Sequence, residues 1–278
     1  MNPFKSNDEL GQVIMNTPVN NPLLMSPYEF NQVMKNSPIA YIPFGTVEWH
    51  GPHLPLGVDT LKIEAFTSKA ASISGGIVFP ALTWNRNTIR YVHGVRYEGV
   101  EHLCQQELPG NIHFIREETF ENLVQDCVAC CIDRGFKAVC VWSGHNAAAL
   151  AEYVPQLNSR LQEKYPDRRI YVSACDGGLV PQKQAREAGV DIIADHAGYW
   201  ETSIIMATHP HLVHMDRVAG KDPDSLCVTN NDVLNASAEM GHKIIELCGF
   251  FMGTHMKKLL SEVVVEVPIP EPMPEATL

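Results

Sequence analysis

IAYIPFGTVEWHGPHLPLGVD, residues 39–59, begins as an apolar run and ends as a polar loop. Residues 39–47 have the length and the aromatic or β-branched content of a buried strand. Because side chains two positions apart on an extended strand point the same way, Glu48 and His50 are expected to project to one side. The glycines and prolines of residues 51–57 predict a non-repetitive loop that bends back over the strand end.

Asp59 closes this stretch and precedes a predicted helix from Thr60 to about Ser72, which Gly75-Gly76 ends. Two interpretations of Asp59 are open. It is a metal ligand that acts with Glu48 and His50, or it is an N-cap, because aspartate is preferred before a helix. His53 is interpreted as a residue that shapes the loop rather than as a ligand.

Strands and helices alternate along the rest of the chain. Buried strands are predicted at residues 77–82, 138–142 and 169–175, and helices at residues 28–35, 60–72, 117–134, 147–165, 181–188 and 230–260. The segment from Trp84 to Gly110 shows neither the alternation of a strand nor the 3.6-residue period of a helix. We interpret it as a long irregular loop that lines a pocket or a subunit contact. We expect one α/β domain over residues 1–278, with an irregular segment at about 1–35 and an extended proline-rich tail at about 263–278.

The amino-acid composition limits the kinds of partner and the cellular compartment that we expect for this chain. The chain has 278 residues, of which 45% are hydrophobic and 19% charged, and its formal net charge is -11. This balance gives no basic patch for nucleic acid, and no apolar run reaches the roughly 18 residues of a membrane helix. The N-terminus lacks the apolar core of a signal peptide, so we expect a cytoplasmic protein that acts on a small molecule. The eight cysteines are accordingly interpreted as reduced thiols.

Two later segments add candidate functional residues. His145 follows the predicted strand at residues 138–142, at the carboxyl end where open α/β sheets place their sites. Asp195, His196 and Glu201 flank a glycine turn at the start of another helix. Glu201 has a second explanation, because the helix dipole favours acidic residues in the first turn.

The available donors predict the kind of metal. Two carboxylates and two imidazoles come from Glu48, His50, Asp59 and His145, with Glu201 or His196 in reserve. This set favours zinc, manganese or iron(II) over magnesium and calcium, which prefer shells of oxygen. Asp59 could bridge two ions. His196 could carry a proton to the leaving group if Asp195 or a backbone carbonyl orients its ring.

Three motifs resemble those of the creatininase (creatinine amidohydrolase) family. They are Glu48-x-His50-Gly51-x-His53-Leu54-Pro55-x-Gly57-x-Asp59, Gly144-His145-Asn146 and His196-Ala197-Gly198-x-x-Glu201-Thr202-Ser203. The resemblance runs from about Ile39 to Pro210. It implies a compact α/β fold around a mainly parallel sheet flanked by helices on both faces, a binuclear metal site and a homo-oligomer, often a hexamer. By position it makes His196 the catalytic proton carrier and assigns the metal ligands to Glu48, His50, Asp59, which bridges, and His145.

The chain departs from this family at one ligand position. Creatininase itself has a metal-binding glutamate two residues after the histidine that corresponds to His145, where this chain has Ala147. Either Glu201 substitutes for that ligand from its helix start, or a second metal ion is held more weakly. Creatinine is therefore not assumed to be the substrate.

The predicted function is that of a metal-dependent amidohydrolase that opens a cyclic amide or a related small carbonyl compound. It would use two divalent ions, zinc or manganese, or else iron(II), and a metal-bound hydroxide would attack the carbonyl. His196, with Asp195 beside it, would protonate the departing atom. Ring opening of a keto-inositol and deformylation are alternatives on the same site. A non-catalytic metal-binding assembly subunit is an alternative of a different class.

Overall fold

The computed structural model describes residues 20–86, 89–112, 114–145, 148–174, 177–192, 195–222, 224–229 and 231–263. The predicted short helix at residues 28–35 is α2 (Pro27–Asn36), which Ser26 and Glu29 close with a capping box. Residues 1–19 and 264–278 lie outside the described residues. The predicted bounds of the domain, with its irregular start and its extended tail, therefore stay predictions.

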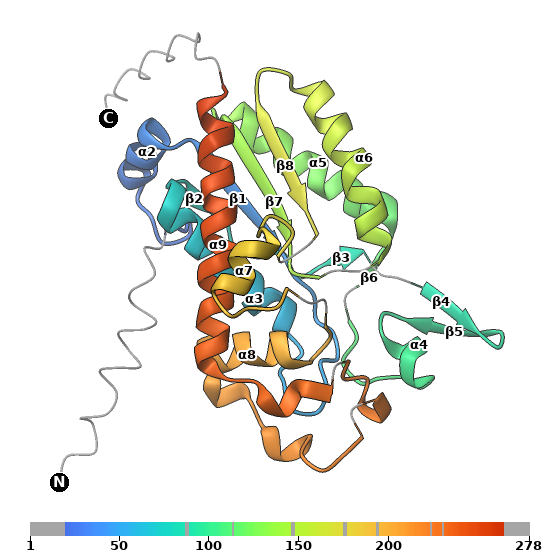
Figure 1. The fold of residues 1–278 in the computed structure, drawn as a ribbon. Coiled ribbons are helices and arrows are strands. Elements are labelled where there is room, and N and C mark those ends of the chain that lie inside the picture. Colours follow the sequence, from blue (N-terminus) through green and yellow to red (C-terminus); the bar gives the residue numbers. More distant parts are fainter. Residues whose placement is uncertain are drawn as a thin grey trace.

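Four parallel strands form the central sheet (Figure 1). Their order is β2 (Ile77–Val78), β1 (Ile39–Phe44), β7 (Ala138–Ser143) and β8 (Arg169–Ser173). β1 and β7 pair along all their residues, from Ile39 opposite Ala138 to Phe44 opposite Ser143. Both strands are buried throughout, as expected for uninterrupted apolar runs in a parallel sheet. The prediction of a mainly parallel sheet is confirmed.

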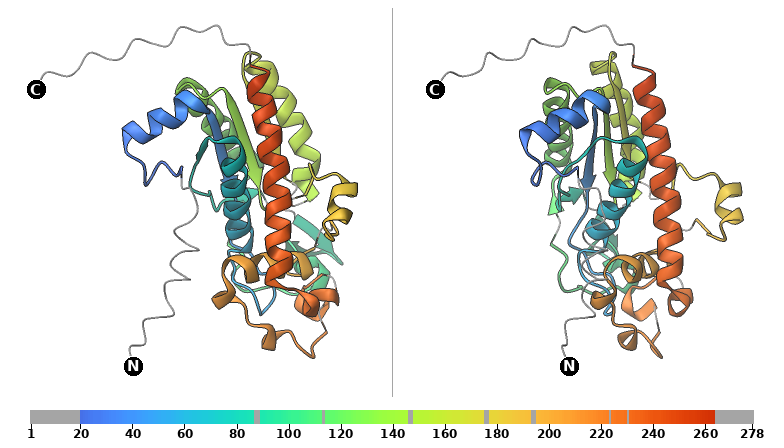
Figure 2. Two further views of the ribbon diagram at one scale, coloured as in Figure 1. Left: turned by 60° about the vertical axis from the view of Figure 1, so that its left-hand side comes forward. Right: turned by 90° about the vertical axis from the view of Figure 1, so that its left-hand side faces the viewer.

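Helices cover both faces of this sheet (Figure 2). One layer contains α2, α5 (Glu117–Asp133) and α6 (Ala148–Lys164), and the other contains α3 (Val58–Ser74), α8 (Tyr199–Thr208) and α9 (Ala238–Ser261). Successive side chains of β1 alternate between the two cores: Ala40 and Ile42 pack with the first layer, and Ile39 and Tyr41 with the second. The predicted α/β fold with helices on both faces is therefore confirmed.

The remaining elements of the second half of the chain are short. α7 (Gln182–Glu187) follows β8, and 3-10 helices occupy Pro210–Leu212, Met215–Arg217, Asp224–Leu226 and Asn231–Asn235. The last of them precedes α9, so the helix predicted over residues 230–260 is divided into two pieces. Within the described part of the chain, every helix is too short or too polar to cross a membrane.

The segment from Trp84 to Gly110 has regular structure, and the prediction of an irregular loop is wrong. β4 (Ile89–Val92) and β5 (Val95–Glu98) form an antiparallel hairpin, α4 (Glu101–Cys104) follows it, and β3 (Asn85–Arg86) pairs with β6 (Phe114–Ile115). His93 and Gly94 have φ values of 50° and 82°, as a two-residue hairpin turn requires. The hairpin strands are largely exposed, so they lack the alternation that marks a half-buried strand.

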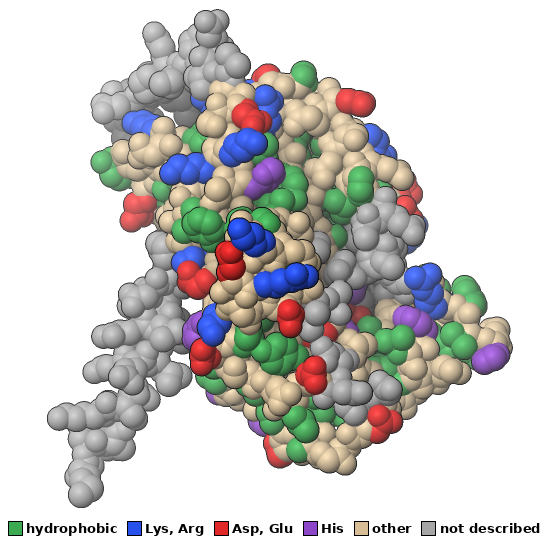
Figure 3. All heavy atoms as spheres, in the orientation of Figure 1, with side chains coloured by type: hydrophobic (Ala, Val, Ile, Leu, Met, Phe, Trp, Pro, Cys, Tyr) green, Lys and Arg blue, Asp and Glu red, His purple; other side chains and the backbone are tan. Residues whose placement is uncertain are grey.

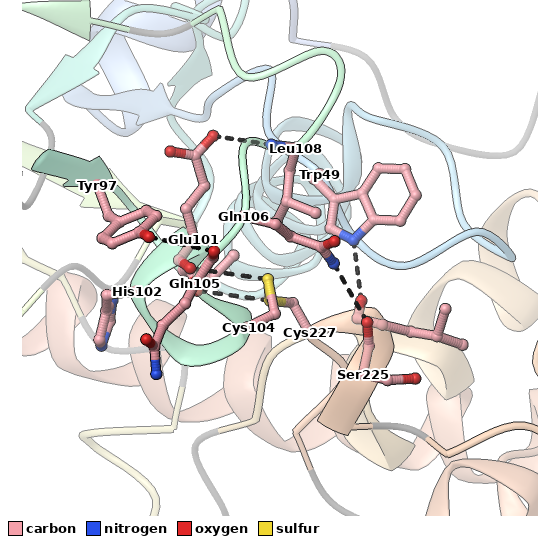
Figure 4. The surroundings of a disulfide bond; sticks show 12 residues. Trp49, Tyr97, Glu101, His102, Cys104, Gln105, Gln106, Leu108, Ser225 and Cys227 are labelled. Carbon is pink, nitrogen blue, oxygen red and sulfur yellow. Dashed lines mark hydrogen bonds between the residues drawn. A yellow bond between two sulfur atoms is a disulfide. The ribbon is translucent and has the colours of Figure 1, made fainter. Parts of the chain in front are cut away.

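The prediction of reduced thiols is wrong for Cys104 and Cys227. A disulfide joins these residues across a sequence separation of 123, and it links α4 to the segment that follows Leu226 (Figure 4). Beside it, the Trp49 indole donates a hydrogen bond to the carbonyl of Leu226 at 3.0 Å. The segment is thus tied to the loop that follows β1. Cys127, Cys130, Cys131 and Cys140 are free thiols.

Glycines of α9 let its backbone lie close to the backbones of α3 and α8. A Cβ atom on Gly241 would lie 1.9 Å from the carbonyl oxygen of Ser203 in α8, and one on Gly253 would lie 2.5 Å from that of Ala70 in α3. Larger residues would push these helices apart. The contact at Gly241 holds the first turns of α8, which carry Glu201, in place against the long helix.

The Gly241→Ala variant is expected to lose about 2 kcal/mol of unfolding free energy, because the new methyl group overlaps the backbone of α8. Urea denaturation followed by circular dichroism measures this loss. Gly57→Ala is the matched control, since a Cβ atom there meets nothing within 4 Å. Equal stability of the two variants would contradict the close contact between α9 and α8.

Candidate metal centre

Five buried side chains with metal-binding atoms meet where β1 and β7 end and where α3 and α8 begin. Glu48 and His50 follow β1, His145 follows β7, Asp59 is the second residue of α3, and Glu201 is the third residue of α8. Each of the five is at most 6% exposed. The meeting point is the carboxyl edge of the parallel sheet. The structure thus brings together all the side chains that the sequence predicts as ligands.

Glu48, Asp59 and His145 form a first group that could hold an ion. His145 Nδ1 lies 3.2 Å from Glu48 Oε2 and 3.2 Å from Asp59 Oδ2. Thr46 Oγ1 donates a hydrogen bond to Asp59 Oδ2 at 2.8 Å, which fixes that carboxylate. Glu48 Oε1 is buried and has no hydrogen-bond partner among the described residues. Such an oxygen is costly in a fold, and it suits a ligand of a cation.

His50, Asp59 and Glu201 form a second group. His50 Nε2 lies 3.5 Å from Asp59 Oδ1 and 3.5 Å from Glu201 Oε2. Its other ring nitrogen, Nδ1, lies 3.1 Å from the carbonyl oxygen of Glu48. Donation from Nδ1 to this carbonyl turns Nε2 toward the two carboxylates, an arrangement common among metal-binding histidines. Asp59 belongs to both groups and offers one oxygen to each.

The helix-terminus explanation fails for Asp59 and describes only part of the contacts of Glu201. The N-cap interpretation of Asp59 is wrong, because α3 begins at Val58, Gly57 is its N-cap, and no side chain caps it. Glu201 does lie in the first turn of α8. Its carboxylate, however, accepts a hydrogen bond from the amide of Ala197 at 2.7 Å and also faces His50.

Mutual attraction sets the protonation of the cluster. Burial alone would lower the pKa of His50 and of His145, but the neighbouring carboxylates outweigh burial and raise these pKa values to about 9 and about 10. Burial alone would raise the pKa of Glu48, yet the charge of His145 lowers it to about 2. Burial also opposes ionisation of Asp59, but Lys62 and His50 hold its pKa well below the usual range. The metal-free cluster is therefore a set of paired charges.

Metal-free protein is expected to lose stability as the pH rises from about 7 to about 10. The pKa values of His50 and His145 in the fold exceed the unfolded value, so their contribution is complete below about pH 6.5. It is lost as the pH rises through about 9 and about 10. Melting temperatures in excess chelator measure the decline. His145→Asn should decline less, and a wild-type melting temperature that is constant or rises would contradict these charge pairs.

His196 forms a third group with Glu48 and His50 that could hold an ion. Its ring centroid lies 4.4 Å from that of His50. Its Nε2 lies 2.6 Å from the carbonyl oxygen of Trp49, so Nε2 carries a proton and Nδ1 keeps its lone pair in the neutral ring. Burial, and then the charge of His50, lower the pKa of His196 and favour that neutral form. The sequence leaves open whether Asp195 or a backbone carbonyl orients the ring of His196. In the structure it is the backbone carbonyl of Trp49.

Asp195 contacts the start of α8. Its Oδ2 accepts a hydrogen bond from the amide of Trp200 at 2.6 Å, and its Oδ1 accepts one from the amide of Glu201 at 3.4 Å. Burial, and then the charge of Glu201, raise the pKa of Asp195 to about 7. These contacts position Glu201, while the carbonyl of Trp49 holds the ring of His196.

Lys62 is not among the residues that the sequence predicts, although it is as buried as the candidate ligands. Its Nζ contacts Glu201 and Asp59. The spacing Asp59-x-x-Lys62 places both residues on one face of α3 and could have indicated their pairing. His53 shapes the loop, as expected: its Nε2 lies 3.0 Å from Thr202 Oγ1 in α8.

The fold and these donors define an α/β protein with a metal site of the catalytic type, in which imidazoles and carboxylates are the ligands. A model of the creatininase family, described as creatinine amidohydrolase, matches residues 24–248. Because this match covers most of the sequence, the chain belongs to the creatininase family. The family resemblance of the three motifs is therefore confirmed.

Individual relatives are similar to this chain at low sequence identity. The creatinine amidohydrolase of Pseudomonas putida is 25% identical over 239 residues, which cover 76% of this chain and 85% of the relative. A crystal structure of creatininase has a TM-score of 0.66 at 20% identity and covers 87% of this chain and 98% of its own. A crystal structure of a putative creatinine amidohydrolase from Bacteroides fragilis has a TM-score of 0.63 at 20% identity. The match covers 91% of this chain and 100% of that one.

Proposed function

We propose that this chain is a metal-dependent amidohydrolase that cleaves the C–N bond of a cyclic amide or a related small carbonyl compound. The observation that carries the proposal is the pair of buried donor groups that share Asp59 at the carboxyl edge of the sheet. Membership of the creatininase family supports the reaction type, since the family is described as creatinine amidohydrolase. The low identity to the curated relative leaves the substrate open within that chemical class.

Two divalent ions, zinc or manganese, or else iron(II), are proposed to occupy the two groups. Imidazole and carboxylate donors suit these metals, and solved creatininases include a manganese form and a mutant of Zn–Zn type. Glu48, Asp59 and His145 would hold one ion, and His50, Asp59 and Glu201 the other. When bound, such ions lower the pKa of water toward neutrality and polarise a carbonyl oxygen.

The side chains around the two groups supply positioning and proton transfer. His196 is proposed to take a proton from the attacking water and to pass it to the departing nitrogen, because its Nδ1 keeps a lone pair while the Trp49 carbonyl holds Nε2. Asp195 positions Glu201 through the amides at the start of α8. Because these groups are held in place by the fold, little reorganisation is needed when the substrate reacts.

A small molecule is the proposed partner. A mutant creatininase of the same fold is complexed with creatine. The net charge of -11, and the mixture of basic and acidic side chains on the face drawn in Figure 3, favour a small substrate over nucleic acid. A homo-oligomer, with the hexamer as its expected form, and a cytoplasmic location stay predictions. The disulfide between Cys104 and Cys227 weighs against the cytoplasm, because such bonds are rare in reducing compartments.

Turnover by metal-restored protein tests the proposal. Chelated protein, with and without added zinc, manganese or iron(II), is assayed against creatinine, hydantoins, small lactams, formamides and keto-inositols. Cleavage of a cyclic amide only after metal is restored would support the proposed function. Deformylation or ring opening of a keto-inositol would instead favour the alternatives on the same site. Metal-dependent stability without turnover would favour a non-catalytic metal-binding assembly subunit.

A further inference from the structure

Lys62 is a buried cation inside the proposed metal centre. Its side chain is 3% exposed, although lysine is almost never buried unless its charge is paired. Nζ lies 2.5 Å from Glu201 Oε1 and 3.2 Å from Asp59 Oδ1. One ammonium group is thus held between a carboxylate of α8 and a carboxylate of α3.

The same two carboxylates are the acids of the second donor group. His50 Nε2 faces this pair at 3.5 Å from Asp59 Oδ1 and 3.5 Å from Glu201 Oε2. An ion in this group and the ammonium of Lys62 would therefore draw on the same negative charge. Their own charges have the same sign, and in a buried site like charges repel more strongly than they do in water.

The first donor group meets less of this competition. It shares Asp59 with the second group but uses the other oxygen: Thr46 and His145 contact Oδ2, whereas Lys62 and His50 contact Oδ1. Its second acid is Glu48, which follows β1. The two groups therefore offer unequal environments to an incoming cation.

We propose that Lys62 competes with a divalent ion for the group of His50, Asp59 and Glu201, and so makes the two metal positions unequal. The group of Glu48, Asp59 and His145 fills first. A second ion enters only when the ammonium of Lys62 leaves the two carboxylates. This inference rests on the proposed metal dependence, and it adds to that proposal a residue that sets the order of metal loading.

Metal titration of the Lys62→Met variant tests this role. The full chain is freed of metal with chelator, dialysed against increasing zinc or manganese, and analysed for bound metal by mass spectrometry. In the wild-type protein the second ion is expected to bind at least about tenfold more weakly than the first. In Lys62→Met the second ion should bind about tenfold or more tightly than in the wild type, with the first ion nearly unchanged.

Thermal unfolding gives a second readout that does not depend on activity. Without Lys62, the charges of Asp59 and Glu201 lose the cation that lies between them. Metal-free Lys62→Met is therefore expected to melt at a lower temperature than the wild-type protein. Saturating metal should recover that difference, because ions that bind only the folded state stabilise it.

Lys69→Met is the matched control, because Lys69 also lies on α3 but pairs with Glu246. It should load metal as the wild-type protein does. Lys62→Gln, which keeps a hydrogen-bond donor, repeats the test if Lys62→Met does not fold. Equal affinities for both ions in the wild type, or a second ion that binds no tighter without Lys62, would contradict the proposed competition by Lys62. Either result would leave the proposed metal dependence standing. No metal in any variant would overturn the proposed function as well.

Discussion

The Asp59→Asn variant is expected to lower kcat/KM for the metal-dependent reaction by about 10³-fold or more. Asp59 offers Oδ2 to the first donor group and Oδ1 to the second, so its neutralisation weakens both. Asparagine keeps the size of the side chain and one acceptor oxygen, but it removes the charge that faces His50, Lys62 and His145. Initial rates at saturating metal and the bound metal per chain measure the effect.

Glu64→Gln is the control for this variant, because it removes the same charge from an exposed position on the same helix. It should retain both metal and turnover. Circular dichroism establishes that both variants fold. If Asp59→Asn bound as much metal as Glu64→Gln and turned over at a similar rate, Asp59 would not join the two donor groups.

The His196→Gln variant is expected to lower kcat for ordinary amides by about 10²-fold to 10⁴-fold, with little change in metal content. Glutamine can still donate a hydrogen bond to the carbonyl of Trp49, but it cannot take up and release a proton. The nitrogen that departs from an unactivated amide needs such a proton. A substrate with a weakly basic leaving group needs it less, so the loss of kcat should be much smaller for that substrate.

Comparison of two amides that differ in the basicity of the leaving group therefore isolates the step in which His196 acts. His242→Gln, on the exposed side of α9, is the control and should leave both rates unchanged. An equal loss for both amides would exclude His196 as the donor to the leaving group. Full activity of His196→Gln would exclude proton transfer by this residue altogether.

The central sheet and the first donor group could be predicted because short stretches of sequence contain the residues that form them. β1 and β7 are buried in a parallel sheet, so uninterrupted apolar runs mark them. Glu48 and Asp59 lie in the stretch of residues 39–59, in which a loop follows the strand. His145 comes just after β7. Parallel strands end at the same edge of a sheet, so local position was enough to predict that these side chains meet.

Features that depend on contacts between distant segments could not be predicted in the same way. Lys62 and Glu201 are separated by 139 positions, and Cys104 and Cys227 by 123. Neither pair leaves a periodic pattern, because it is the packing of one element against another that brings the two residues together. The β4–β5 hairpin could not be predicted for a different reason: its exposed strands bury little apolar surface, so no alternating pattern marks them.

An anomalous-difference map from crystals of the metal-loaded protein, recorded at the manganese or zinc absorption edge, tests the proposed metal centre most directly. A peak enclosed by Glu48, Asp59 and His145 is expected, with a weaker peak between His50 and Glu201, where Lys62 competes. Ions found only at histidines outside this cluster, or no ions at all, would contradict the assignment of the buried cluster as a metal centre.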